Sequence, residues 1–232
     1  MSLTTDHGVP SLRIPFSAAL GAHTRPLQEE FFRIDFVRAA VRGELDRPAY
    51  LAFLGQAYHH VKHTVPLLEA TRARVDARHA WLREGLDHYI AEETGHELWI
   101  LDDIAACGGE PDAVARGRPD LPCELMVAYA WDVVTRVNPL GFFGMAHVLE
   151  GVSARGASGA AEAIRTRLGL PAGAVRYLSS HGELDQDHQR FFNGLMDRLD
   201  DPGGQADVLH CAGVFYRLYG DIFRALRSRE AA

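Results

Sequence analysis

Two short segments carry acids and histidines at spacings that suit metal binding by helices. Glu93 and His96 are three residues apart, so on an α-helix that turns about 100° per residue they share one face. His181, Asp185 and His188 fall at positions i, i+4 and i+7, and they also share one face. A Glu-x-x-His step presents one carboxylate and one imidazole inward in ferritin-like di-iron bundles. The two segments therefore predict a metal site inside a helical bundle.

A third candidate ligand is Glu150, which follows the apolar run 142–149. An acid on an otherwise apolar helix face is costly to bury unless a cation pairs with it. Oxygen and nitrogen donors without thiolate favour iron or manganese over structural zinc. Carboxylates can bridge two ions and leave open positions for dioxygen and substrate, which indicates catalysis. Glu92 and His96 are i,i+4, so Glu92 could take the place of Glu93.

Helices are the elements that must position these ligands. Apolar residues recur at three- and four-residue steps, whereas strict alternation is hard to find, and this pattern predicts an all-α fold. Residues 1–24 are expected to form an extended N-terminal segment and residues 25–230 one helical domain. Asp46 ahead of Pro48 marks a helix start, and residues 110–122 a loop. The predicted helices span about 25–42, 48–75, 78–107, 123–137, 140–168 with a bend or break near Gly151 and 156–159, 172–199 and 206–228.

Composition excludes several classes of function. The net charge of −7 and the absence of a Lys/Arg cluster argue against nucleic-acid binding. No apolar stretch approaches the ~20 residues that span a bilayer, and no signal peptide is recognisable. Cys107, Cys123 and Cys211 form no CxxC pair, which favours reduced thiols in the cytoplasm. We expect a cytoplasmic protein whose partner is a small-molecule substrate, with a homodimer left open.

Three motifs are similar to those of the haem-oxygenase-like di-iron oxidases. They are the run 50–60, the segment 92–103 with its Glu-Glu-Thr-Gly-His-Glu and Leu-Asp-Asp steps, and the His-x-x-x-Asp-x-x-His pattern of 181–188. These oxidases form a family of iron-containing redox enzymes, in a superfamily that also holds the thiaminase II (TenA) proteins, the pyrroloquinoline-quinone (PQQ) synthases and haem oxygenase. The resemblance covers about residues 20–230 and implies a compact single-domain bundle of seven to eight helices.

The resemblance also implies a ligand set and a reaction class. Two ferrous ions, or manganese in their place, would be bound with O2 as co-substrate. The substrate would be a fatty acid, an amino acid or a similar molecule, oxidised by decarboxylation, C–C cleavage or N-oxygenation. No catalytic residue is expected beyond the metal ligands. The family pattern falls on Glu93, His96, Glu150, His181, Asp185 and His188.

Other members of the superfamily suggest alternative functions. Thiaminase II proteins use a nucleophilic Cys where this chain has the run 139–142, Pro-Leu-Gly-Phe, so that activity is not expected. Haem oxygenase uses a proximal His on its first helix, for which His23 is the nearest candidate. A metal-free TenA- or PQQ-synthase-like enzyme, whose activity survives chelation, is one alternative. A non-catalytic small-molecule or haem-binding protein is the other.

Several further residues are candidates for the surroundings of the metal. His59 and His63 are four residues apart, and we interpret the group His59, His60 and His63 as surrounding or surface residues rather than a second metal site. Asp102 and Asp103 are expected, like Glu97, to orient ligand imidazoles or to cap the bundle. Aromatic residues and Met145 could line a substrate pocket, although plain core packing is the alternative. The candidates are Glu92, Glu97, Tyr58, His59, Phe142, Phe143 and His147.

Overall fold

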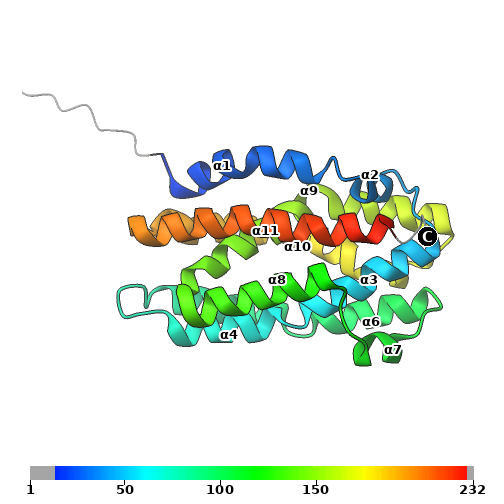
Figure 1. The fold of residues 1–232 in the computed structure, drawn as a ribbon, viewed down its shortest axis with the longest axis horizontal. Helices are drawn as coiled ribbons and strands as arrows, with labels where there is room; N and C mark the ends of the chain where they lie inside the picture. The colour runs from blue at the N-terminus through cyan, green and yellow to red at the C-terminus, as the bar shows by residue number, and fades with distance from the viewer. Residues whose placement is uncertain (1–13, 229–232) are drawn as a thin grey trace, which may run out of the picture.

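The computed structural model describes residues 14–228, which form helices joined by short turns with no β-strand among them (Figure 1). The predicted all-α fold is confirmed. None of the helices in this range is long and apolar enough to cross a bilayer. The α-helices are α1 Phe16–Phe31, α2 Asp35–Val41, α3 Arg47–Val61, α4 Thr64–Arg74, α5 Leu82–Glu93, α6 His96–Ala106, α7 Pro111–Arg116, α8 Leu121–Asp132, α9 Phe142–Leu168, α10 Arg176–Arg198 and α11 Pro202–Ser228.

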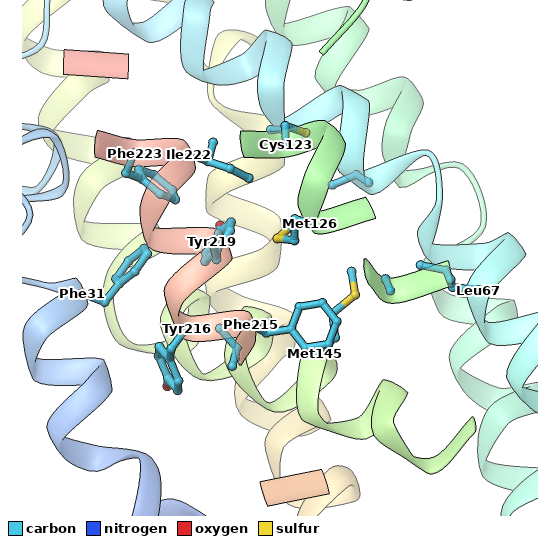
Figure 2. Close-up of a cluster of buried hydrophobic side chains, with 14 of the residues drawn as sticks. Phe31, Leu67, Cys123, Met126, Met145, Phe215, Tyr216, Tyr219, Ile222 and Phe223 are labelled. Atoms are coloured by element: carbon cyan, nitrogen blue, oxygen red, sulfur yellow. The ribbon is translucent and has the colours of Figure 1, made fainter. Parts of the chain in front are cut away.

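The core lies around α11, which packs against α1, α2, α3, α8 and α9 (Figure 1). Figure 2 shows its buried aromatic side chains beside Phe31 of α1. Phe31 stacks on Tyr219 at a ring separation of 5.3 Å and meets Phe223 edge-on at 5.1 Å. Such pairs add specific geometry to the burial of large apolar surfaces. These ring contacts hold α1 against α11.

The first predicted helix differs from the structure at its start. Helix α1 begins at Phe16, so the expectation of an extended segment up to residue 24 is wrong for residues 16–24, while residues 1–13 lie outside the described residues. Pro15 precedes the helix rather than breaking it, and Pro26 is accommodated within it. The chain then turns after Phe31, and α2 follows as a separate helix.

Two other predicted helices are each divided in two. The predicted helix 48–75 is interrupted between α3 and α4, and 78–107 is interrupted at Thr94 and Gly95, where Gly95 has φ of 91°. The predicted start of α3 is confirmed, because the Asp46 carboxylate accepts a hydrogen bond of 2.8 Å from the Ala49 backbone N–H. Both breaks lie in polar stretches, 59–64 and 91–97, so hydrophobic periodicity does not reveal them.

The second half of the chain departs from prediction in smaller ways. The predicted loop 110–122 contains the short helix α7, and α8 ends in a π-helical turn, Val133–Val137. Helix α9 is continuous, so of the bend or break predicted near Gly151 and 156–159 the break is wrong. Gly156 serves close packing instead, because a Cβ atom there would lie 2.9 Å from Cε1 of Phe32. Helix α10 begins at Arg176, after a 3-10 turn at Ala172–Ala174.

Candidate metal centre

Glu93 and His96 meet at the junction between α5 and α6. Glu93 is the last residue of α5 and His96 the first of α6, so they do not share one continuous helix as the i,i+3 spacing predicted. Thr94 is extended and Gly95 is left-handed, and this reversal brings the two side chains together. The buried His96 donates from Nδ1 to Oε2 of Glu93 over 3.1 Å. The pair forms by a different backbone route from the one predicted.

His181 of α10 completes a three-residue group with this pair. One potential ligand atom from each of Glu93, His96 and His181 lies within 4.8 Å of the other two. His181 donates from Nδ1 to the Tyr177 carbonyl oxygen over 3.0 Å, so its Nε2 carries the lone pair that can bind a metal. These residues could hold a metal through one oxygen and two nitrogen atoms. Glu93, His96 and His181 are called the EHH group below.

The electrostatic environment keeps Glu93 ionised. Burial raises the pKa of its carboxyl, but the hydrogen bond from His96 and the nearby His181, His96 and His188 outweigh burial and lower the pKa. A carboxylate binds a metal only in its deprotonated form. Glu93 is therefore in the form that a metal requires at neutral pH.

Two of the other predicted ligands, Glu150 and His188, lie outside the EHH group. Glu150 of α9 lines the same cavity as Glu93 and His181. His188 of α10 is buried, and its Nε2 lies 3.0 Å from Oε2 of Glu92, a contact at ion-pair distance. The side chain of Asp185 lies outside the described residues.

Glu92 and Glu93 have separate surroundings, although they are adjacent in the sequence. Oε2 of Glu92 lies 3.1 Å from Nε2 of His88 as well as close to His188. The EHH group contains Glu93 and not Glu92. The alternative in which Glu92 replaces Glu93 beside His96 therefore has no support in this geometry.

A mostly apolar cavity of about 150 Å³ adjoins the EHH group. Figure 2 shows part of its wall, where Phe31, Met145, Tyr219 and Phe223 lie. Such a lining offers water few hydrogen-bond partners, and electrostatic interactions are stronger where water is excluded. Its histidines and acids are His60, Glu93, Glu150 and His181.

The remaining predicted candidates divide between the cavity and the core. Phe142 lines the cavity, whereas Phe143 is fully buried and packs against Phe142 and Phe192. His147 does not line it: Nε2 of His147 bonds Oγ1 of Thr24 over 2.8 Å. The Thr24 hydroxyl donates to the Leu20 carbonyl, so His147 is the donor in this bond. Burial lowers the pKa of His147 to about 4.

Neither Tyr58 nor His59 lies among the described residues of the cavity wall. Nδ1 of His59 contacts the Lys62 ammonium over 3.3 Å, and Lys62 also lies over the Tyr58 ring. The neighbouring His60 faces the cavity instead. The sequence does not distinguish His59 from His60. Helix α3 is buried on more than one face, so both positions are buried and no hydrophobic periodicity separates them. Glu97 is half-buried and has no ion pair among residues 14–228.

Asp103 connects the two helices that carry the histidines of the EHH group. It is fully buried on α6 and accepts hydrogen bonds from the backbone N–H groups of Arg176 and Tyr177, at 3.1 and 2.9 Å, in the first turn of α10. Burial raises its pKa to about 6, although these bonds and the Arg176 charge act in the opposite direction. Since Tyr177 in turn holds His181, Asp103 places α10 relative to His96. Asp103 therefore caps the N-terminus of α10.

Comparisons with known proteins place this geometry in context. A family model described as an iron-containing redox enzyme matches residues 51–220. A comparison with curated protein sequences finds no match.

Solved structures share the fold at low sequence identity. A domain of unknown function from Shewanella denitrificans, with a haem-oxygenase-like fold, has a TM-score of 0.81 and 19% identity, covering 92% of each chain. A TenA homologue from Pseudomonas syringae has a TM-score of 0.77 and 14% identity, covering 97% of this chain and 100% of its own. Haem oxygenase-1 from Synechocystis, solved with haem, has a TM-score of 0.74 and 13% identity, covering 93% and 94%. The predicted haem-oxygenase-like fold is confirmed. His23, the candidate proximal haem ligand, is exposed on α1.

Proposed function

The chain belongs to the iron-containing redox enzyme family, and on this premise we propose that it is a non-haem di-iron oxidase or oxygenase that uses O2 to oxidise a small organic substrate. The EHH group would hold one iron. Glu150, Asp185 and His188 would hold the second. Manganese could replace iron in either position, because both ions accept the same oxygen and nitrogen ligands.

The observation that carries this proposal is the EHH group itself. Three side chains from three helices place donor atoms within 4.8 Å of one another beside an apolar cavity. One carboxylate and two imidazoles without a thiolate are a donor set that suits iron. The residues therefore fit the metal that the family description implies.

Bound ferrous iron would supply the electrons that reduce dioxygen and drive oxidation of the substrate. The chain supplies the ligands in the required form: Glu93 is ionised, and His181 is held by the Tyr177 carbonyl in the tautomer that leaves Nε2 available. The apolar wall keeps water away from the substrate and orients it against the EHH group.

Support for a second metal position is of a different kind. Glu150 lines the same cavity, and His188 is close enough to Glu93 to lower its pKa. A second cation would compensate the charge that Glu150 brings to this cavity. The contact between His188 and Glu92 would have to rearrange if His188 bound iron.

The test is oxygen uptake by anaerobically prepared protein before and after chelation. Ferrous-loaded protein should consume O2 on mixing, and chelated protein and His96→Ala should not. His210→Ala is the control, because His210 is exposed on α11. Uptake that persists in His96→Ala would contradict the proposal. Catalysis that survives chelation would favour the metal-free enzyme, and a Soret band in purified protein would favour haem binding.

A further inference from the structure

His60 is a buried imidazole that no part of the proposed metal centre explains. It lies near the end of α3 with 3% of its surface exposed and lines the cavity that Glu93, Glu150 and His181 also line. Its ring meets Tyr219 edge-on at 5.8 Å, which fixes its orientation. It is not in the EHH group.

The Nδ1 atom of His60 has no hydrogen-bond partner among the described residues. Buried polar side-chain atoms in folded proteins are almost always hydrogen-bonded, so an exception needs an explanation. The adjacent His59 provides a contrast within the same turn. It is equally buried, but its Nδ1 contacts Lys62 and it does not line the cavity.

Burial, followed by the charges of His181, His63 and His59, lowers the pKa of His60 to about 3. The ring is therefore neutral, with one N–H donor and one acceptor nitrogen. It can bind an oxygen-bearing group such as a hydroxyl, carbonyl or carboxyl. Around it the wall is largely apolar, with Met145, Leu149 and Phe223 among its members.

We propose that His60 binds the substrate, by a hydrogen bond to the polar oxygen group of an otherwise apolar molecule that fills this cavity. The inference rests on the proposed function, because it takes Glu93, Glu150 and His181 as metal ligands and leaves His60 for the substrate. It adds the substrate class: a compact apolar body with one oxygen-bearing polar group. A cavity of about 150 Å³ is comparable with engineered apolar cavities that bind benzene.

The test uses two probes that have nearly the same shape, benzyl alcohol and ethylbenzene, which differ in a hydroxyl against a methyl group. Their dissociation constants are measured by calorimetry on anaerobic, iron-loaded protein. The quantity of interest is the ratio of the two constants, since it cancels changes in cavity shape common to both probes. In His60→Phe this ratio should shift against the alcohol by roughly three- to tenfold, the value of one neutral hydrogen bond.

Two further variants control for structure. His60→Asn keeps a donor and an acceptor near Nδ1 and should restore much of the wild-type ratio, whereas His60→Leu, a second apolar replacement, should behave like His60→Phe. His59→Phe replaces the neighbouring histidine, whose Nδ1 contacts Lys62 and which does not line the cavity. It should leave the ratio of the two dissociation constants unchanged.

An unchanged ratio in both apolar His60 variants would overturn the proposal, as would a wild type that binds neither probe. Loss of iron in His60→Asn and His60→Phe would also overturn it, by making His60 a ligand. Iron content of the same wild-type sample reports separately on the proposed function: a wild type without iron contradicts that function, while the probe ratio is still measurable on it.

Discussion

At the scale of single residues, the account depends on an ionised Glu93 beside His96 and His181. Glu93→Gln preserves size but removes the charge, so we expect ferrous affinity to fall by more than the roughly 10- to 100-fold that loss of an outer hydrogen bond causes. Competition with a calibrated chelator measures this affinity. Glu97→Gln, in the first turn of α6 but outside the cavity wall, is the matched control and should bind iron like the wild type.

The residue types of the site could be predicted, but not all of their contacts. Glu93, His96 and His181 were identified from spacing, and they do assemble. The choice between Glu92 and Glu93 was left open because a continuous helix would place either near His96. The backbone reversal at Gly95 brings Glu93, and not Glu92, beside His96, and its signal in the sequence is a single glycine. His60 could not be separated from His59 because both are buried.

At the scale of elements, the α5–α6 junction determines how the EHH group forms. Gly95 has φ of 91° and nothing within 4 Å of a Cβ placed there, so Gly95→Ala introduces backbone strain without a clash. We expect a loss of about 1–2 kcal/mol in unfolding free energy together with weaker iron binding. Gly169→Ala, at the end of α9 with φ of 63° and equally open space, is the matched control.

The two glycine variants should lose similar stability in urea unfolding, but only Gly95→Ala should lose iron affinity. Equal iron affinity in both variants would show that the junction does not position the ligands.

The link between α6 and α10 gives a second prediction at this scale. Asp103→Ala leaves the backbone N–H groups of Arg176 and Tyr177 without their acceptor, so we expect a loss of about 2–4 kcal/mol in unfolding free energy. Asp102→Ala removes the exposed acid next to it and should change stability by less than about 0.5 kcal/mol. Chemical denaturation at pH 7 measures both. Equal stability of the two variants would contradict this role of Asp103.

Helix boundaries were the weakest part of the sequence prediction. The interruption at 94–95 and the one between α3 and α4 lie in short polar stretches, which hold too few apolar residues for a periodicity to reveal a break. Gly156 packs on Phe32 instead of breaking α9. The start of α3 was predictable because a side-chain cap at Asp46 defines it locally. A helix end that is defined by a local side-chain cap can be predicted from sequence, whereas a helix break that depends on tertiary packing cannot.

At the scale of the whole molecule, buried neutral histidines should make the protein sensitive to acid. The pKa of His147 is lowered to about 4 by burial, against 6.5 in the unfolded chain. Its contribution to stability is therefore present above pH 6.5 and lost as pH falls towards 4. This loss amounts to at most about 3–4 kcal/mol, since the two pKa values differ by about 2.5 and a difference of one corresponds to about 1.4 kcal/mol. His60 acts in the same direction.

His147→Gln keeps a donor for Thr24 without the titration, so its unfolding free energy should fall less between pH 7 and pH 4.5 than that of the wild type. Asp103, with a raised pKa, acts in the opposite direction in both proteins and cancels from the comparison. Urea unfolding of iron-free protein at the two pH values measures the difference. An equal fall in unfolding free energy in the two proteins between pH 7 and pH 4.5 would refute this source of acid sensitivity.

The central claim is that this interior binds iron through the EHH group. Its most direct test is the iron content per folded chain after anaerobic loading with ferrous iron and desalting. We predict about two irons per chain in the wild type and in His210→Ala, as in di-iron carboxylate bundles, and a large loss in His181→Ala. A wild type that retains no iron, or a folded His181→Ala variant with the full wild-type content, would contradict the account.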